Sequence, residues 1–224
     1  LKAIVPGTRL ILVGDSSQLP SVGPGNVLKD IIDSKAFSVV RLSKIYRQAE
    51  SSHIVLNAHK INAGELITLN NKNKDFFFFE KQDVRSVMGA LIYLVKTKLP
   101  EYIGTSPFEI QVLTPMRKGE LGVEHLNEVL QYYLNPASES KKEKEGRIGV
   151  FREGDKVMQV KNNYKLEWKI TNSKGFSIEE GLGVFNGDMG IIKQINTYSE
   201  RITVVFDENR EAEYPFSSLD ELEL

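Results

Sequence analysis

Residues 10–25 read LILVGDSSQLPSVGPG, and this stretch decides which fold the chain is expected to adopt. Its first four residues form a continuous apolar run, which is typical of a parallel strand buried on both faces. Glycine, aspartate and proline then mark a loop. The apolar spacing from Asn26 to Ile32 predicts a helix with Asn26 as its N-cap. Strand, loop and helix in this order predict one unit of an α/β sheet.

The same alternation continues through residue 137. Apolar runs predict further strands at 37–42, 76–79 and 109–113. Helical spacing predicts helices at about 52–63, 84–99 and 123–134. We expect these helices to end at Gly64, Pro100 and Asn135, respectively. Strands that alternate with helices of this length predict a mainly parallel sheet.

The composition changes at residues 138–147, which read SESKKEKEGR. We interpret this charge-dense stretch as an exposed crossing between two domains, and a flexible loop is the alternative. Beyond it, short apolar segments predict strands at 155–160, 189–196, 201–207 and 211–215. Turns are expected at 186–187 and 207–209. Short strands within one small unit predict a small barrel.

The composition narrows the class of protein. The 224 residues are 41% hydrophobic and 26% charged, which is ordinary for a globular chain. Without cysteine there are no disulfides or thiolate zinc sites, and with three histidines we expect no structural metal. No apolar run approaches the roughly 20 residues that span a bilayer, so we expect a cytoplasmic protein with no membrane partner. The formal net charge of -1 leaves any nucleic-acid binding to local basic surfaces.

The loop after the first predicted strand carries the strongest chemical signal. Ligands of open α/β sheets bind beyond the carboxyl ends of the strands, where this loop emerges. The side chain of Gln18 has both a donor and an acceptor, so it suits contact with a terminal phosphate or an attacking water. A glycine- and proline-rich turn capped by Asp15, without any ligand, is the alternative.

Residues 14–20, GDSSQLP, resemble motif III of superfamily 1 helicases, and their extension SVGPG at 21–25 resembles its RecD-type form. The resemblance implies that Gly14, Asp15 and Gln18 belong to the ATP-binding site. It gives Gln18 a catalytic role, in which this side chain senses the γ-phosphate.

Residues 42–49, LSKIYRQA, resemble motif IV of the same superfamily. The resemblance implies that Arg47 is a second catalytic and ATP-binding residue, reaching the γ-phosphate from a second motor domain. Arginine suits this role because its planar donors stay charged and bind phosphate bidentately. The alternative is a surface arginine paired with Glu50. Residues 52–62 continue the RecD-like pattern, and we expect their histidines to lie at the start or on the surface of a helix.

Residues 112–123, VLTPMRKGELGV, again follow a predicted strand and lead into a helix. Hydroxyl, amide and basic groups of this kind hold a phosphodiester backbone without reading its sequence. The family resemblance implies a DNA-backbone contact here, formed by Thr114, Pro115, Arg117 and Lys118. An ordinary loop is the alternative.

The C-terminal part, with FREGDKVMQ at 151–159 and VFNGDMG at 184–190, resembles the small SH3-like barrel inserted in RecD-type helicases. Here Tyr164 and Lys165 are candidate DNA-binding residues, because aromatic rings stack on bases and lysines hold phosphates. Trp168 and Lys169 have the same chemistry. A hydrophobic plug is the alternative for Trp168.

The resemblance to the RecD family, which includes the exodeoxyribonuclease V alpha subunits, covers almost the whole chain. It implies an α/β fold made of partial RecA-like P-loop NTPase motor domains with a parallel sheet, plus the SH3-like β-barrel. Residues 1–36 would end the first motor domain, 37–137 would form part of the second, and 138–224 would form the inserted barrel.

The sequence contains no G-x-x-x-x-G-K-[ST] loop, and neither of its Asp-Glu pairs follows a predicted buried strand. The chain also starts at Leu1 rather than methionine and ends without a polar tail, so we expect a segment of a longer protein. ATP and Mg²⁺ are then cofactors of that parent enzyme. We expect no cofactor bound to this chain alone, and no ATP hydrolysis by it.

The function implied is that of an ATP-dependent DNA helicase, translocating 5′ to 3′ on single-stranded DNA, in recombination and repair. Single-stranded DNA and ATP are its expected partners, together with other subunits where the helicase belongs to a helicase–nuclease complex. Two alternatives stay open. One is a nucleic-acid-binding or partner-docking module with no ATP role. The other is an RNA helicase or relaxase-linked helicase of the same superfamily.

Overall fold

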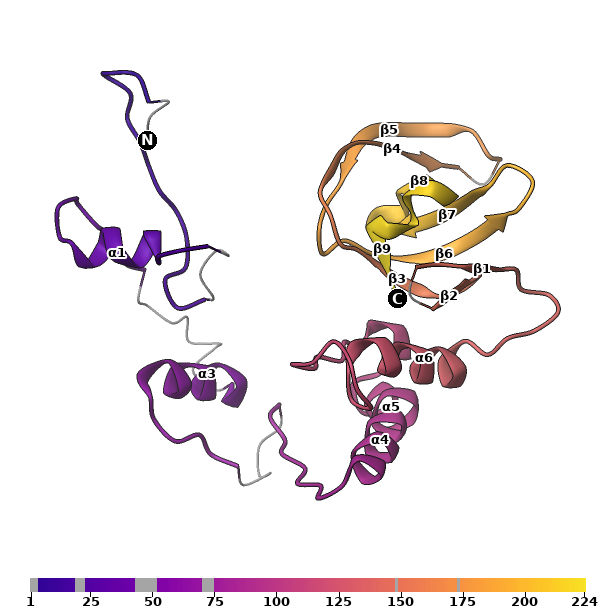
Figure 1. The fold of residues 1–224 in the computed structure, drawn as a ribbon, viewed down its shortest axis with the longest axis horizontal. Helices are drawn as coiled ribbons and strands as arrows, with labels where there is room; N and C mark the ends of the chain where they lie inside the picture. Colours follow the sequence, from indigo (N-terminus) through magenta and orange to yellow (C-terminus); the bar gives the residue numbers. More distant parts are fainter. Residues whose placement is uncertain (1–3, 19–22, 43–51, 70–74, 148, 173) are drawn as a thin grey trace. The chain divides into compact units, whose positions relative to one another are not determined.

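The computed structural model describes residues 4–18, 23–42, 52–69, 75–147, 149–172 and 174–224. The chain divides into two units, residues 1–80 and residues 81–224. The first unit contains helices α1 (Val27–Asp33) and α3 (His53–Ala63), and the second contains the other helices and all the described strands (Figure 1). No described helix combines the length and the apolar character needed to cross a membrane.

The helix α1 begins where the sequence predicts, after Asn26. The side chain of Asn26 makes no cap hydrogen bond, contrary to the prediction. Instead, its backbone N–H donates to Oδ2 of Asp30 at 3.1 Å, so a carboxylate one turn into the helix binds the chain at its start. The preceding Gly25 has a φ of 88°, a backbone conformation that residues with a Cβ rarely adopt.

The helix α3 confirms the predicted boundaries to within one residue. The hydroxyl of Ser52 accepts a hydrogen bond from the backbone N–H of Val55 at 3.4 Å, which caps the first turn. Gly64 ends the helix with a φ of 75°, and its N–H bonds to the carbonyl of Ile61.

The strands predicted at 10–13, 37–42, 76–79 and 109–113 are not formed in the described residues. Val13, Leu42 and Leu113 expose 92%, 98% and 88% of their surface, which is opposite to the burial predicted for them. A parallel strand depends on hydrogen-bonded neighbours and on helices that cover both faces of its sheet. Because the described part of residues 4–137 contains no paired strand, the predicted parallel sheet is not confirmed.

The helix predicted at 84–99 extends further than expected. It consists of α4 (Val84–Tyr93), a π-helical turn η1 (Leu94–Lys98) and α5 (Leu99–Ile103), and it ends at Gly104. Pro100 does not stop it because this residue lies directly after the π-helical turn, where the hydrogen-bonding pattern of the helix changes. The π-helical turn before Pro100 replaces the regular α-helical hydrogen bonds with a wider pattern. A proline in a regular α-helix would break one of those bonds.

The connection to the β-rich part is more ordered than a flexible loop. After the short helix η2 (Pro107–Glu109), α6 (Val123–Leu134) has the predicted limits and ends at Asn135. Strand β1 (Glu143–Glu145) then pairs antiparallel with β2 (Val150–Arg152). Most of the charge-dense stretch that includes β1 therefore has defined partners.

The main sheet is antiparallel and has seven strands in the order β5-β4-β8-β7-β6-β3-β9 (Figure 1). The strands are β3 (Lys156–Gln159), β4 (Asn163–Thr171), β5 (Ser177–Val184), β6 (Met189–Asn196), β7 (Arg201–Phe206), β8 (Glu211–Pro215) and β9 (Leu222–Glu223). Short helices η3 (Asp207–Asn209) and η4 (Phe216–Glu221) flank β8. The four predicted strands are confirmed as β3, β6, β7 and β8. No ladder joins β5 to β9 in the described residues, so a closed barrel is not confirmed.

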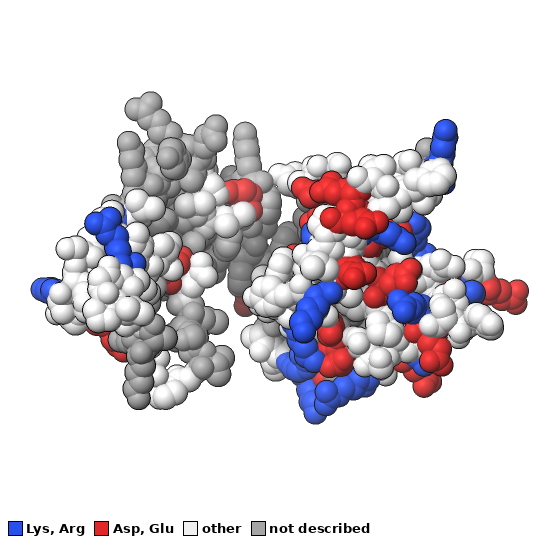
Figure 2. Space-filling model, turned by 90° about the horizontal axis from the view of Figure 1, so that it is seen from above, with Lys and Arg blue, Asp and Glu red and all other residues white. Residues whose placement is uncertain are grey.

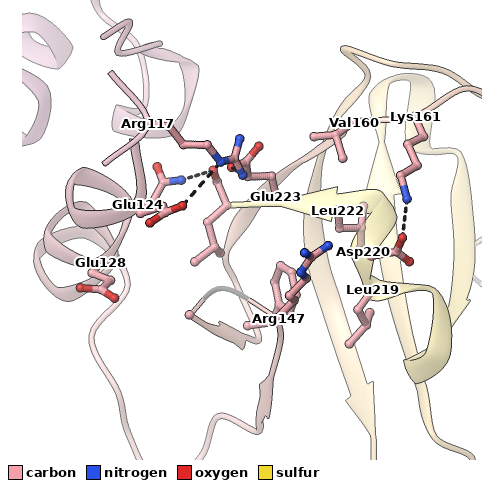
Figure 3. A pocket seen from close by; sticks show the side chains of 14 residues that line it. Arg117, Glu124, Glu128, Arg147, Val160, Lys161, Leu219, Asp220, Leu222 and Glu223 are labelled. Atoms are coloured by element: carbon pink, nitrogen blue, oxygen red, sulfur yellow. Dashed lines mark hydrogen bonds and ion pairs between the residues drawn. The ribbon is translucent and has the colours of Figure 1, made fainter. Parts of the chain in front are cut away.

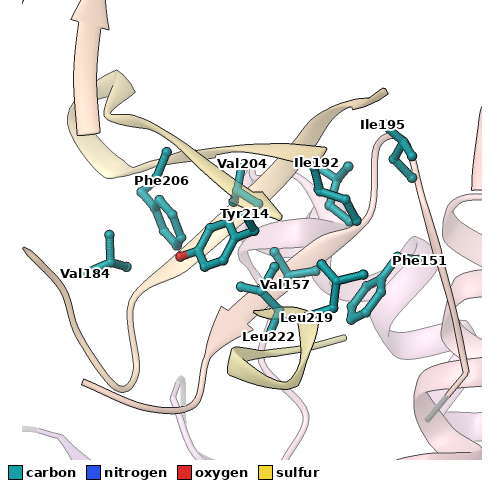
Figure 4. Close-up of a cluster of buried hydrophobic side chains, with 12 residues drawn as sticks. Phe151, Val157, Val184, Ile192, Ile195, Val204, Phe206, Tyr214, Leu219 and Leu222 are labelled. Atoms are coloured by element: carbon teal, nitrogen blue, oxygen red, sulfur yellow. The ribbon is translucent and has the colours of Figure 1, made fainter. Parts of the chain in front are cut away.

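The sheet curls around one hydrophobic core, shown in Figure 4. Strands β7 and β8 bury alternate residues, as strands with one face on a core do. Tyr214 and Gln159 are both fully buried, and the Tyr214 hydroxyl donates to the Gln159 side-chain oxygen at 2.8 Å. Burial raises the pKa of Tyr214, which keeps this hydroxyl protonated as a donor.

Candidate nucleotide-sensing and nucleic-acid contact sites

The loop at 14–18 holds the Gln18 side chain in a defined orientation. Oδ1 of Asp15 accepts from the backbone N–H of Ser17 at 2.9 Å, and its Oδ2 accepts from Nε2 of Gln18 at 3.1 Å. With its donor engaged, the Gln18 side chain presents its carbonyl oxygen, which has no hydrogen-bond partner among the described residues. This carbonyl oxygen can accept a hydrogen bond from a water molecule.

Gly14 lets this loop lie close to α1. A Cβ atom at Gly14 would lie 2.8 Å from a methyl carbon of Leu28, which is closer than such contacts occur. Gly14 therefore allows the loop to pack closely against α1. The hydrogen-bonded pair of Asp15 and Gln18 lies in the residues that follow Gly14. The described residues contain no group of three or more histidines and carboxylates that could hold a metal ion.

Arg47, the other predicted catalytic residue, lies outside the described residues, as do residues 43–51 around it and 19–22 after Gln18. Its placement opposite a nucleotide therefore stays a prediction.

The start of α3 shows what its first histidine does. The hydroxyl of Ser52 donates to Asp75 Oδ2 at 2.6 Å, and the backbone N–H of His53 donates to Asp75 Oδ1 at 3.2 Å. The hydrogen bond from Ser52 is the largest cause that holds the pKa of Asp75 below its usual value. His53 thus lies at a capped helix start, one of the two positions predicted for the histidines of this segment.

The loop at 114–122 is closed by its own hydrogen bonds. The Thr114 hydroxyl donates to the carbonyl of Leu121 at 2.7 Å, and the N–H of Val123 bonds to the carbonyl of Met116 at 3.0 Å. Gly122 is required by the tight turn, because a Cβ there would lie 2.5 Å from the Lys118 carbonyl carbon. The hydroxyl of Thr114 is therefore already engaged in shaping the loop, while Pro115 is exposed within it.

The two basic residues of this loop, Arg117 and Lys118, differ in their surroundings, and Figure 3 shows those of Arg117. Arg117 Nη2 lies 2.8 Å from Glu223 Oε1, and Arg117 Nε lies 3.5 Å from Glu124 Oε1. Lys118 is exposed and makes no ion pair with any residue that the structure describes. Next to Arg117 a pocket of about 160 Å³ opens between α6 and β9, with Lys161 and other charged residues on its walls.

In the β-rich part, Tyr164 and Lys165 lie on β4 and are exposed. The ring of Tyr164, 68% exposed, meets the ring of Phe185 edge to face, with 5.5 Å between centroids. Phe185 is 40% exposed and was not assigned a role from the sequence. Its only sequence signal is its place in the VFNGDMG segment. The two rings form an aromatic surface of the kind that stacks on bases.

Trp168 has a structural role instead. It packs against the hydrophobic core, and the guanidinium of Arg210 lies 5.7 Å from its ring centroid. A Cβ at Gly181 on the neighbouring strand would lie 2.3 Å from the Trp168 ring. The alternative that treats Trp168 as a hydrophobic plug is therefore the one that the structure supports.

A buried polar cluster joins α6 to the β-rich part, and sequence reasoning missed it. Asp155 is 2% exposed, and its carboxylate accepts from Gln131 Nε2, Asn135 Nδ2 and the Arg152 backbone N–H, each at 2.6 Å. Burial raises the pKa of Asp155, although these hydrogen bonds oppose that shift. Asp155 is the first residue of the strand predicted at 155–160, but nothing in the sequence indicated its partners on α6.

Charge is mixed on the surface of the molecule. Figure 2 shows acidic and basic side chains interspersed on the face in view, without a continuous basic stripe. Contact with a nucleic acid would therefore depend on individual residues such as Lys118, as the net charge of -1 predicts.

Two parts of the chain match the profiles of known protein families. Residues 126–206 match the profile of the ATP-dependent RecD-like DNA helicase SH3 domain, and residues 1–76 match an AAA domain profile. The ATP-dependent RecD2 DNA helicase of Deinococcus radiodurans is 33% identical over 209 residues, which are 93% of this chain and 25% of that protein. The RecBCD enzyme subunit RecD of Mycobacterium tuberculosis is 29% identical over 208 residues, 85% of this chain and 32% of that subunit. Its counterpart from Mycolicibacterium smegmatis is 24% identical over 202 residues, 86% of this chain and 33% of that subunit.

A match to an AAA domain followed by a match to a RecD-like helicase SH3 domain defines the class as that of helicases. Within this class, the chain belongs to the RecD-like family. It spans about a quarter to a third of the length of the relatives compared.

Proposed function

We propose that this chain supplies the nucleotide-sensing and DNA-tracking parts of an ATP-dependent DNA helicase that acts in recombination and repair. One observation carries the proposal: Asp15 holds the amide of Gln18 at 3.1 Å, in a loop whose sequence resembles helicase motif III. A glutamine fixed by its donor end presents an acceptor to an attacking water. This is what a positioning group in phosphoryl transfer requires.

ATP, bound with Mg²⁺, supplies the γ-phosphate whose hydrolysis drives the motor. In our proposal Gln18 orients the water, and Arg47 stabilises the charge that develops on the transferred phosphate. Gly14 and Asp15 place Gln18, and they contribute to the nucleotide site through that placement.

We propose two surfaces for single-stranded DNA. The first is the loop with Thr114, Pro115, Arg117 and Lys118, whose exposed cations suit phosphates. The second is the exposed ring of Tyr164 with Phe185 beside it and Lys165 next in the strand. Contacts to phosphates and stacking on the faces of bases do not distinguish one base from another, so binding should be independent of sequence.

The direction of translocation, 5′ to 3′, and an association with helicase–nuclease subunits are further parts of the proposal. They are supported by the family resemblance, and two of the relatives compared are named as RecD subunits of the RecBCD enzyme.

The test uses an enzyme that carries this segment downstream of a phosphate-binding loop. Gln18→Ala should reduce DNA-stimulated ATP hydrolysis by roughly 10²-fold or more, since a positioning group for the attacking water is lost. Ser17→Ala is the matched control, because Ser17 contacts Asp15 only through its backbone N–H. It should leave turnover unchanged.

Equal turnover in Gln18→Ala and the original enzyme, with both folded, would contradict the nucleotide-sensing role. If DNA binding then survived without any ATP dependence, the segment would be a nucleic-acid-binding module.

A further inference from the structure

Arg117 is already occupied by carboxylates, whereas its neighbour Lys118 is not. Arg117 Nη2 lies 2.8 Å from Glu223 Oε1 and its Nε lies 3.5 Å from Glu124 Oε1 (Figure 3). Lys118 makes no ion pair with any described residue, and its side chain is exposed. A phosphate that binds Arg117 must therefore displace a carboxylate, whereas a phosphate that binds Lys118 displaces none of the described carboxylates.

Glu223 is held in place by the fold. It lies on β9, opposite Met158 of β3, and only 22% of its side chain is exposed. The next residue, Leu224, accepts a hydrogen bond through its carbonyl from Asn127 Nδ2 on α6 at 2.7 Å. These contacts fix the strand that carries Glu223 beside the loop, so the pair with Arg117 is built into the structure.

The Arg117 side chain stays accessible. It is 57% exposed, and it lies at the rim of the pocket between α6 and β9. The planar donors of a guanidinium match a phosphate as well as they match a carboxylate. Because a partly exposed ion pair is weak in water, exchange of one anion for the other is energetically easy.

We propose that Glu223 occupies Arg117 in the absence of nucleic acid and that a backbone phosphate displaces it, so that Glu223 lowers the affinity of this loop for DNA. This inference rests on the proposed DNA surface at 114–118 and adds a residue that tunes it. Lys118 then contributes to binding directly. The net contribution of Arg117 to the binding free energy is its contact with the phosphate minus the cost of breaking its ion pair with Glu223.

The experiment is a fluorescence anisotropy titration of labelled oligothymidine with the 224-residue chain at low salt. Glu223→Gln should raise the affinity about two- to fivefold, the range expected for loss of one partly exposed ion pair. This gain should vanish in the Arg117→Gln background. It should persist in the Lys118→Gln background, which removes the same charge from the same loop and is the matched control.

Salt dependence gives a second readout. In the original chain, the carboxylate that Arg117 releases on binding DNA takes up cations again, which offsets part of the counterion release from the phosphate. Glu223→Gln removes this offset, so the slope of log affinity against log salt should steepen by up to about 0.7. Glu223→Asp keeps the charge and shortens the side chain, and it should give a smaller gain in affinity. This second variant also serves if Glu223→Gln does not fold.

The outcomes separate the two proposals. If Lys118→Gln and Arg117→Gln both leave binding unchanged, the proposed DNA surface is wrong. If Lys118→Gln weakens binding but Glu223→Gln does not strengthen it, the surface stands and the role of Glu223 is wrong. A gain that is equal with and without Arg117 also contradicts that role, since it would reflect net charge alone.

Discussion

The side-chain amide of Gln131 donates a 2.6 Å hydrogen bond to Oδ2 of Asp155, which ties the last turn of α6 to the start of β3. The same carboxylate accepts from Asn135 Nδ2, also at 2.6 Å. The helix that follows the 114–118 loop is thereby joined to the sheet that carries Tyr164. The two proposed DNA surfaces are consequently held in one unit of the structure.

Asp155→Ala should destabilise this unit strongly. The substitution leaves three buried N–H donors without their acceptor, and each unsatisfied donor costs about 1–3 kcal/mol. We expect a loss of at least about 3 kcal/mol in the free energy of unfolding. Urea denaturation followed by fluorescence of Trp168, the single tryptophan, measures it, since this ring packs against the core. Glu213→Ala, which removes an exposed pair with Arg201, should cost about 0.5 kcal/mol or less. Equal losses in the two variants would contradict the importance of the polar cluster.

The pH dependence of stability should also identify Asp155. Its pKa is raised in the folded state by burial, so the folded chain binds this proton more readily than the unfolded chain does. The contribution of Asp155 to stability is therefore greatest at low pH and is lost as pH rises through the raised pKa. Asp155→Asn cannot titrate at this position. The stability difference, original minus variant, should grow as pH falls from neutrality towards the ordinary aspartate value. A difference that is constant or shrinks on acidification would rule this out.

Arg47→Ala, in an enzyme that carries this segment and a phosphate-binding loop, should reduce ATP turnover by roughly 10³-fold or more. An arginine that reaches transition-state charge acts on the chemical step, so affinity for single-stranded DNA should change little. Lys44→Ala is the control, because Lys44 is a cation of the same motif but has no assigned phosphate contact. This variant should retain ATP turnover. Steady-state hydrolysis and DNA titrations measure the two effects. Near-normal turnover of folded Arg47→Ala would exclude Arg47 from the site.

Tyr164→Ala should weaken binding of single-stranded DNA by roughly fivefold or more, since one stacked base contributes about 1–3 kcal/mol. Tyr164→Phe keeps the ring and should bind normally. Tyr198 is a matched control because it is 97% exposed and lies in the turn that follows β6, whereas Phe185 precedes β6. Tyr198→Ala should have no effect. Equal weakening by Tyr164→Ala and Tyr198→Ala would show that the aromatic surface is not specific to Tyr164.

Sequence patterns predicted well where structure depends on neighbours along the chain. The limits of α6 and the strands β6 to β8 follow from periodicity, since each buries a repeating set of its own side chains. The hairpin of β4 and β5 is absent from the predicted strands although apolar and polar residues alternate from Tyr164 to Ile170, so the sequence did carry a signal for β4. In β5 the alternation is interrupted at Glu180, and most of its residues are exposed. The apolar runs at 10–13 and 109–113 predicted strands that the described structure lacks. An apolar run indicates burial in a sheet only when neighbouring strands are present to pair with it.

By itself, the sequence determined the chemistry of the 14–18 loop, because Asp15 bonds to residues only two and three positions away. It also determined the family, through motifs of a few consecutive residues. Only the tertiary structure brought Gln131 to Asp155, 24 residues apart, and Arg117 to Glu223, 106 residues apart. Periodicity and turn chemistry act over a few residues, whereas these partners meet only once the sheet has curled around its core and β9 has paired with β3.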